Sequence, residues 1–165
     1  MRAKSVIIVT SSTYSSLISG RTLDLLLQNI FQLKKNPVVV LGPDGDAFLR
    51  ESKLIEECEI VFDPNYQGGF FSGVKAGLHA IHGSTAFVLP LMETLPPDSI
   101  WVELEDYLLN PAEDLTQCHL IRCVPDTNCR VELITDVVRL KKLDSQTSWN
   151  DDEQIKPRLI SQISR

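Results

Sequence analysis

The chain has 165 residues, 43% of them hydrophobic, and a formal net charge of −6 at pH 7. This size and composition predict one domain, residues 1–165, with a substantial hydrophobic core. The negative charge argues against general binding to nucleic acid or to anionic membranes, and no apolar run approaches the ~20 residues that span a bilayer. The apolar stretch at residues 6–9 is too short for a signal peptide, so we expect a cytoplasmic protein.

Short apolar runs rich in β-branched residues alternate with helical patterns. In chain order, the patterns predict a strand at residues 5–10, a helix at 22–33, a strand at 37–41, a helix at about 46–57, a strand at 59–62, a helix at 69–82, a strand at 85–91, a helix from about 96 to 109, strands at 118–124 and 131–134, and helices near 135–143 and 152–163. This alternation implies an α/β fold of three layers, with a mostly parallel twisted sheet between helices.

Ligands of such sheets bind beyond the carboxyl ends of the strands. The expected rim comprises residues 10–16, 42–44, 64–72 and 91–94. At residues 64–72 a turn and a glycine pair lead from a strand into a helix. A helix N-terminus beside the end of a strand offers unpaired N–H groups and a partial positive charge, so it can hold a polar or anionic ligand.

Several segments resemble motifs of the MobA-like nucleotidyltransferases, which include the molybdenum-cofactor guanylyl- and cytidylyltransferases. Residues 65–78 resemble the family's Asn-x-x-x-Gly-x-x-Ser-x-x-x-Ala-Gly-Leu element, and residues 19–26 resemble its Gly-Arg-Pro-Leu-Leu helix start. Residues 38–44 resemble its second strand, residues 88–98 the strand and loop that present its metal-binding aspartate, and residues 130–135 its Gly-His-Pro-Val segment. The resemblance implies a nucleotide-diphospho-sugar transferase-like (Rossmann-like) fold.

The resemblance also implies a site for a nucleotide or a nucleotide-sugar, with Mg²⁺ as the family's cofactor. Family members use Mg²⁺ to transfer a nucleotidyl group from a nucleoside triphosphate. Their matching positions line a base or phosphate pocket, and in this chain these positions are Asn65, Gly69, Ser72, Gly73 and Lys75. The alternatives are that the glycines allow close packing on the sheet and that Asn65 forms an Asx turn.

The loop after the first strand departs from the family pattern. In the family this loop holds the triphosphate through its backbone, an Arg and a Lys. Residues 10–19 of this chain contain no Gly, Arg or Lys. Ser11, Ser12 and Thr13 remain as candidate nucleotide-binding donors of hydroxyl and N–H groups, and a solvated loop is the alternative.

The metal position departs as well. A gapless match places Met92 where the family has its metal-binding aspartate, and a shift by one residue places Glu93 there. Glu93 is therefore the candidate catalytic residue and Mg²⁺ ligand, with an exposed loop carboxylate as the alternative. The family's C-terminal Asp-x-Asp-Thr-Pro segment has no counterpart, because residues 156–165 differ from it.

These departures predict weakened or lost catalysis. An acidic chain without the clamping cations holds a triphosphate poorly. We expect a pseudoenzyme with a nucleotidyltransferase fold that retains binding of a nucleotide or nucleotide-sugar. One alternative is an active Mg²⁺-dependent nucleotidyltransferase acting on a molybdenum-cofactor-like or phosphorylated acceptor. The other is a non-enzymatic protein that binds a protein partner or forms a homodimer.

Three further groups of residues each allow two interpretations. The four cysteines are expected to be free thiols, with a zinc site as the alternative for Cys118, His119, Cys123 and Cys129. A histidine pair stands three residues apart and could share a metal, but partly exposed helix histidines are commoner; the pair is His79 and His82. Aromatic residues could form an apolar patch for a partner; these are Phe70 with Phe71 and Trp101 with Tyr107.

Overall fold

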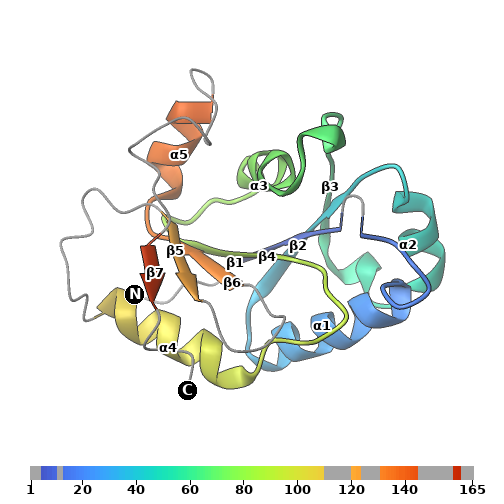
Figure 1. Cartoon of the computed structure of the whole chain (residues 1–165), viewed down its shortest axis with the longest axis horizontal. Coiled ribbons are helices and arrows are strands. Elements are labelled where there is room, and N and C mark those ends of the chain that lie inside the picture. The colour runs from blue at the N-terminus through green and yellow to red at the C-terminus, as the bar shows by residue number, and fades with distance from the viewer. Residues whose placement is uncertain (1–4, 11–12, 110–119, 124–130, 145–157, 161–165) are drawn as a thin grey trace.

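The computed structural model describes residues 5–10, 13–109, 120–123, 131–144 and 158–160. A seven-stranded sheet lies between two layers of helices (Figure 1). The strands are β1 (Ser5–Val9), β2 (Asn36–Leu41), β3 (Glu59–Phe62), β4 (Ala86–Pro90), β5 (Leu120–Cys123), β6 (Val131–Ile134) and β7 (Arg158–Ile160). The helices are α1 (Gly20–Gln32), α2 (Gly45–Glu51), α3 (Phe70–Leu78), α4 (Asp98–Leu109) and α5 (Val137–Asp144), with the short 3-10 turns η1 (Ile55–Glu57) and η2 (Tyr66–Gly68).

The sheet is mostly parallel, as the alternation of elements predicts. Its strand order is β3-β2-β1-β4-β6-β5-β7. β1 pairs in parallel with β2 and β4, so that Ile7 lies opposite Val38 on one side and Val88 on the other. β3 is parallel to β2, whereas β6 is antiparallel to both of its neighbours.

The central strands are buried on both faces, and alternate side chains of each strand enter different core clusters. Val6 and Ile8 of β1 face the cluster formed with α1 and α4, and Ile7 and Val9 face the cluster formed with α3 and α5. Figure 1 shows these two helix pairs on opposite sides of the sheet. This double burial accounts for the nearly continuous apolar runs of these strands. Among the described helices, none combines the length and the apolar character that crossing a membrane requires.

An aromatic and ionic contact joins α4 to the sheet. Trp101 is 1% exposed and packs edge to face on Phe87 of β4, with ring centroids 5.1 Å apart. Lys35 pairs with Glu105 of α4, and its Nζ lies 4.9 Å from the centroid of the Phe87 ring. The idea that Trp101 belongs to a surface patch is therefore wrong, because its side chain fills the core. The side chain of Tyr107 lies outside the described residues.

Two predicted helices differ from the structure. Residues 158–160 form β7, which pairs in parallel with β5, instead of the end of a helix over residues 152–163. A proline at position 157 disfavours an uninterrupted helix there. The helix predicted at 46–57 ends at Glu51, because Ser52 adopts an extended conformation with ψ of 129°, and η1 follows as a separate turn.

Glycines bring α3 close to the sheet. A Cβ atom built on Gly73 would lie 2.5 Å from Cγ1 of Val9, and one built on Gly77 would lie 2.5 Å from Cγ2 of Ile7. Both distances are far below van der Waals contact, so α3 can lie at this depth only with glycine at these two positions. The packing explanation for Gly73 is thus supported by its contacts.

We expect Gly73→Ala to destabilise the fold by about 1 to 3 kcal/mol, because the added methyl group collides with a buried strand residue. Chemical denaturation measures the free energy of unfolding. Gly83→Ala is the matched control, since the nearest atom to a Cβ there is 3.8 Å away, and it should change stability by less than about 1 kcal/mol. Equal effects of the two substitutions would contradict the packing argument.

Candidate functional site

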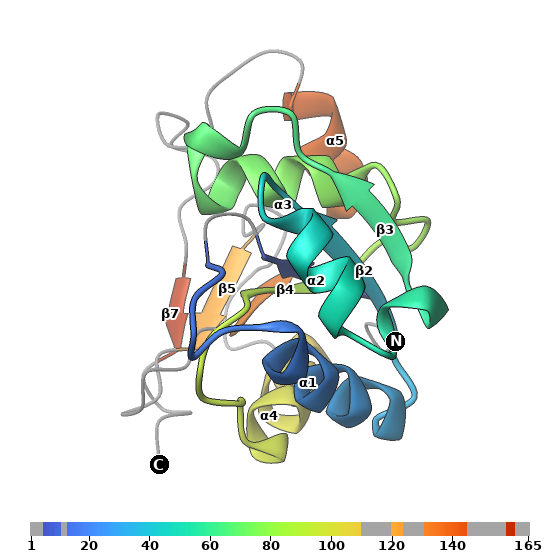
Figure 2. The ribbon, with the colours of Figure 1, turned by 90° about the vertical axis from the view of Figure 1, so that its right-hand side faces the viewer.

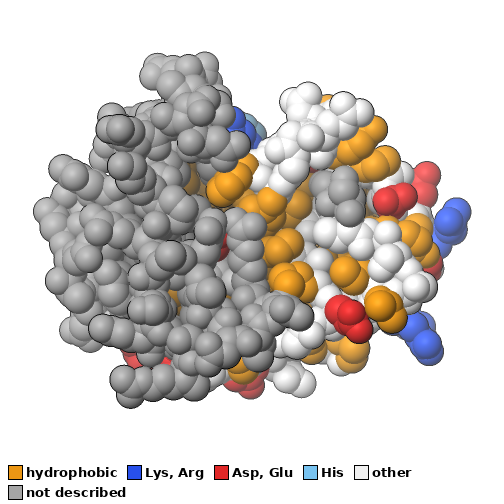
Figure 3. Space-filling model, in the orientation of Figure 1, with side chains coloured by type: hydrophobic (Ala, Val, Ile, Leu, Met, Phe, Trp, Pro, Cys, Tyr) orange, Lys and Arg blue, Asp and Glu red, His pale blue; other side chains and the backbone are white. Residues whose placement is uncertain are grey.

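The carboxyl ends of β1 to β4 lie on one side of the molecule, at the left of Figure 2, where the connections to the following helices form a rim. The view of Figure 3 faces this rim. In the described part of this face, hydrophobic side chains and atoms of uncharged side chains or backbone predominate, Asp or Glu side chains lie among them, and Lys and Arg side chains are seen at its margins. The rim therefore has the position expected for a ligand site in this fold class, without a cationic centre among the described residues in view.

The connection after β3 is organised by Asp63. Its side chain is buried (5% exposed), and its Oδ1 accepts hydrogen bonds from the N–H of Asn65 (2.9 Å) and the hydroxyl of Ser72 (3.1 Å). The Ser72 hydroxyl also lies 2.7 Å from the carbonyl oxygen of Asn65. Asp63, and not Asn65, is therefore the residue whose side chain makes the Asx turn. The other oxygen, Oδ2, is buried without a hydrogen-bond partner, which is unusual for a buried carboxylate.

Helix α3 begins beside this carboxylate. Gly69 precedes the helix with φ of 80°, a left-handed conformation that favours glycine. No side chain caps the helix, and its first turn contains no acidic residue. The partial positive charge of this helix end is therefore met by the Asp63 carboxylate beside it and by no acidic residue of the helix itself.

The structure brings only some of the predicted α3 residues to this end. Ser72 is half-buried and bonds to Asp63 and to the carbonyl oxygen of Asn65, whereas Asn65 and Gly69 are exposed and Gly69 immediately precedes the helix. Gly73 is buried against β1. Lys75 is half-buried in the last turn of α3, away from the first turn. Phe70 and Phe71 contact each other edge to face at 5.6 Å and pack against the core cluster beneath α3.

The loop after β1 is held by its own hydroxyl groups. The hydroxyl of Thr10, which is buried, donates to the carbonyl oxygen of Val40 at 2.7 Å. Thr13 is half-buried, and its hydroxyl donates to the carbonyl oxygen of Thr10 at 2.7 Å. The predicted site residues Ser11 and Ser12 lie outside the described residues, so their role stays a prediction.

The N-terminus of α1 carries an acidic partner that the sequence did not reveal. Oε2 of Glu51 accepts a hydrogen bond from the N–H of Gly20 at 2.9 Å, and Oε1 accepts one from the hydroxyl of Tyr14. The Tyr14 ring packs edge to face on Phe48, with centroids 5.3 Å apart. The hydrogen bond from Tyr14, followed by that from Gly20, lowers the pKa of Glu51, and the same Tyr14–Glu51 bond raises the pKa of Tyr14.

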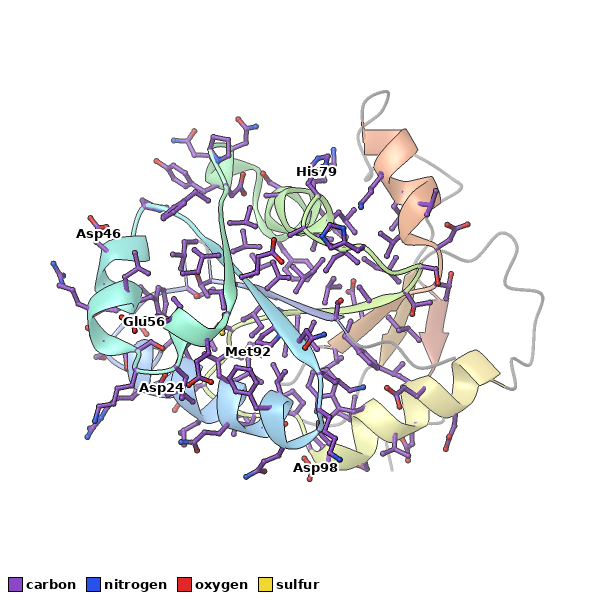
Figure 4. All side chains as sticks on the ribbon, turned by 180° about the vertical axis from the view of Figure 1, so that it is seen from behind. Asp24, Asp46, Glu56, His79, Met92 and Asp98 are labelled. Carbon is purple, nitrogen blue, oxygen red and sulfur yellow. The ribbon has the colours of Figure 1, made fainter. Side chains whose placement is uncertain are left out.

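A second carboxylate, Asp24, fixes the chain after α2 to α1. It accepts hydrogen bonds from the hydroxyl of Ser52 (2.5 Å) and from the N–H groups of Lys53 (3.0 Å) and Leu54 (3.1 Å). Figure 4 shows Asp24 on the side of α1 that faces this connection. Burial raises the pKa of Asp24, but these hydrogen bonds outweigh it, so that the pKa lies below its usual value.

The described residues do not form a metal centre. Glu93 is exposed in a bend after β4, and Met92 beside it is half-buried. No group of three or more His, Cys, Asp or Glu side chains that could hold a metal occurs among the described residues. Glu93 thus lies exposed in this bend, and its role as a Mg²⁺ ligand stays a prediction, since Mg²⁺ can be held by one or two carboxylates together with the phosphates of a substrate.

The histidine pair and the cysteines form no metal site in the described part of the chain. His79 and His82 are exposed, and His79 projects from α3 away from the sheet (Figure 4). Cys118, His119, Cys129 and the side chain of Cys123 lie outside the described residues. Cys58 is a free, half-buried thiol whose burial, with the nearby carboxylates, raises its pKa to about 12.

A pocket of about 540 Å³ lies at the opposite, amino-terminal ends of the strands. Its lining includes Phe31, Asn36, Glu57, Glu59 and His82. It shares none of the residues of the carboxyl rim, and it does not correspond to a predicted site.

Comparisons with known proteins support the fold. By sequence, the chain matches no family model and no curated protein. By structure, it is similar to 4-diphosphocytidyl-2C-methyl-D-erythritol synthase from Anaerococcus prevotii, with a TM-score of 0.67 and 12% identity over 96% of this chain and 88% of that chain. A cytidylyltransferase from Leptospira borgpetersenii is also similar, with a TM-score of 0.53 and 10% identity over 90% of this chain and 66% of that chain.

A third similar structure is a mannosyltransferase from Pyrobaculum calidifontis in complex with GDP-Man and Mn²⁺. Its TM-score is 0.54 and its identity 14%, over 82% of this chain and 45% of that chain, so this chain spans about half its length. The fold is therefore a Rossmann-like α/β fold of the nucleotide-diphospho-sugar transferase type. At these identities, the likeness concerns the fold alone.

The lowered pKa of Asp24 predicts acid sensitivity. Because the folded-state pKa is below the unfolded value, Asp24 stabilises the fold above the unfolded pKa, near 3.8, and this contribution is lost as the pH falls through the folded pKa. Denaturation at a series of pH values should show a stability gap between wild type and Asp24→Asn at pH 7 that narrows below about pH 4. Asp46→Asn, which changes an exposed carboxylate of α2, is the control and should leave the pH profile as in wild type. If the stability difference between wild type and Asp24→Asn stayed constant as the pH fell, the lowered pKa of Asp24 would be refuted.

Proposed function

We propose that the chain binds a nucleotide or nucleotide-sugar at the carboxyl rim, between Asp63 and the N-terminus of α3, and that nucleotidyl transfer is weakened or lost. The observation that carries this proposal is the unpartnered, buried Oδ2 of Asp63 beside an uncapped helix N-terminus. A carboxylate oxygen accepts hydrogen bonds from the N–H or O–H groups of a base or sugar. A helix N-terminus binds phosphate through backbone N–H groups. The carboxylate oxygen and the helix N-terminus together therefore suit a ligand that has a phosphate as well as a base or sugar.

Because Asp63 Oδ2 is buried, a ligand reaches it only if the chain around Asp63 moves. Residues 64–69 follow Asp63 directly, are mostly exposed, include a 3-10 turn and end at the left-handed Gly69. We therefore expect this connection to move when a ligand binds, while the hydrogen bond from Ser72 holds Asp63 in place.

The similar structures support the class of ligand. One is a cytidylyltransferase and another contains GDP-Man, a nucleotide-sugar. The MobA-like motifs at residues 65–78 fall on the same connection and helix, which favours that branch of the nucleotidyltransferases for this chain.

The case for weakened catalysis rests on charge. Phosphoryl transfer depends on positioned cations or metal ions around the developing negative charge. The loop after β1 contains no Arg or Lys, and among the described residues no group of three or more His, Cys, Asp or Glu side chains gathers around Glu93. The structurally similar mannosyltransferase was solved with Mn²⁺. The effect of a divalent metal on ligand binding therefore tests whether catalysis is weakened. Neither alternative function has a specific observation in its favour.

The first test is Asp63→Asn. Asparagine keeps the shape of the side chain, but one of the two carboxylate oxygens becomes an amide nitrogen and the charge is lost. We expect calorimetry to show at least about tenfold weaker binding of the nucleotide that stabilises the wild type most in a screen of GDP, CDP, GDP-mannose and the triphosphates.

Asp98→Asn is the matched control. Asp98 accepts a hydrogen bond from the side chain of Asn29 at 2.7 Å on the helical surface, and it is labelled at the bottom of Figure 4. Its substitution should leave nucleotide affinity within about twofold of wild type. If no nucleotide or nucleotide-sugar raises the melting temperature of the wild type, the proposed function fails.

Magnesium provides the second test. A saturating ligand, at about 100 times its Kd, stabilises a fold by about 2.7 kcal/mol, which corresponds to several degrees in Tm. We expect this shift to be the same with and without Mg²⁺ and in Glu93→Ala. An active transferase would instead need Mg²⁺ for the shift and lose it in Glu93→Ala. Release of pyrophosphate from a triphosphate would likewise overturn the weakened-catalysis part.

A further inference from the structure

The pocket at the amino-terminal ends of the strands is built from parts of the chain that the proposed function does not use. Ser5, Asn36 and Glu59 are the first residues of β1, β2 and β3, and all three line it. The register places Ser5 opposite Asn36, and Glu59 opposite Val38. Because residues two apart on a strand share a face, these side chains lie on the face of the sheet that α3 covers.

The other walls come from the ends of two helices. Most of residues 80–85, which follow α3, line the pocket, as does Phe31 near the end of α1. Figure 4 views the molecule from this side, with Glu56 of η1 and His79 at the end of α3 labelled. The carboxyl end of a helix carries a partial negative charge, so two such ends lie beside the pocket. Its volume of about 540 Å³ is in the range of small-molecule sites.

One polar group at the pocket lacks a hydrogen-bond partner. Thr85 lines the pocket and is only 7% exposed, and its hydroxyl group makes no hydrogen bond within the described residues. Thr10, which is buried to a similar degree, donates its hydroxyl hydrogen to the carbonyl oxygen of Val40. A buried hydroxyl without a partner costs free energy. A ligand in the pocket would supply the missing bond.

The charges of the lining favour a cation. Glu57 and Glu59 are exposed, and neither carboxylate forms an ion pair with a described residue. The described lining contains no Lys or Arg, and Lys35, which directly precedes β2, pairs with Glu105 of α4. Among the described residues, no group of three or more His, Cys, Asp or Glu side chains could hold a metal. The pocket therefore suits an organic cation better than a bare metal ion.

We propose that this pocket binds ammonium groups on an aliphatic chain, and that its ligand is a free polyamine. The carboxylates of Glu57 and Glu59 accept hydrogen bonds from the ammonium groups, and the hydroxyl oxygen of Thr85 accepts another. The aliphatic part packs against Phe31 and Pro37, which line the same pocket, and the aromatic ring also attracts a cation. The site is separate from the rim, so this inference does not rest on the proposed function.

Spermidine tests the site by calorimetry at about 0.15 M salt, where long-range attraction to an acidic surface is screened. We expect binding to wild type, and at least about tenfold weaker binding when Glu57→Gln and Glu59→Gln are combined. Thr85→Val keeps the shape of the side chain and removes the hydroxyl, and it should weaken binding about threefold or more. Glu56→Gln is the matched control, because it removes the same charge from the same turn at a residue outside the lining. It should leave the affinity within about twofold of wild type.

Amide resonances locate the bound spermidine. Those of Gly83 and Thr85 should shift during the titration, and that of Gly69 at the carboxyl rim should not. The proposal is wrong if spermidine does not bind wild type, if Thr85→Val binds like wild type, or if Glu56→Gln weakens binding as much as the double variant. A lysine side chain carries the same ammonium group, so N-acetyl-lysine methylamide is titrated in parallel. Tighter binding of this compound than of spermidine would overturn the assignment to a free polyamine. No nucleotide is present, so failure of the proposed function leaves these results unchanged.

Discussion

The close contact between α3 and β1 determines the geometry of the rim. Gly73 and Gly77 have no side chains, so the helix lies directly on Val9 and Ile7. At this depth the first turn of α3 reaches the carboxyl end of the sheet beside Asp63. A larger residue at either position would lift the helix from the sheet and move Ser72 away from the carboxylate. The same two glycines thus determine both the packing of the core and the position of the candidate site.

Two buried or fixed carboxylates then give the two ends of the rim different properties. Asp63 bonds to the connection that precedes α3 through one oxygen and leaves the other without a partner. Glu51 uses both oxygens within the protein, one for Gly20 and one for Tyr14. Both helix ends therefore have a carboxylate beside them, and only the carboxylate at α3 leaves an oxygen without a hydrogen-bond partner. This arrangement fits the proposed binding of a ligand without the clamped charge that triphosphate chemistry requires.

The fold was largely predictable because the strands are buried on both faces. Runs of β-branched residues such as residues 38–40 have few explanations other than a central parallel strand, and the sheet order places them there. The local sequence pattern predicted a helix at residues 152–163, whereas residues 158–160 form the strand β7. This strand is only three residues long and depends on its pairing with β5, which the local pattern does not contain. Strand preference in such short segments follows context more than composition.

The site was less predictable. The motif at residues 65–78 predicts Ser72 and Gly69 as candidates, whereas Gly73 has its place in that motif because it packs against β1. The motif does not include Asp63, although an Asp directly after a strand and before Pro-Asn is a turn signal. Glu51 could not be found from the sequence, since nothing local links it to a glycine 31 residues earlier.

The thiol of Cys58 makes the connection between α2 and β3 observable. Its Sγ lies 3.5 Å from the carbonyl oxygen of Leu54, within the segment that Asp24 holds, and its pKa is raised to about 12. Only thiolate reacts rapidly with alkylating reagents, so the folded protein protects this cysteine at neutral pH. Its labelling rate would therefore measure how often this segment opens in the native state, in the way that hydrogen exchange does for amides. The cysteine is thus a built-in probe of local unfolding at the amino-terminal end of β3, on the side of the sheet opposite the rim.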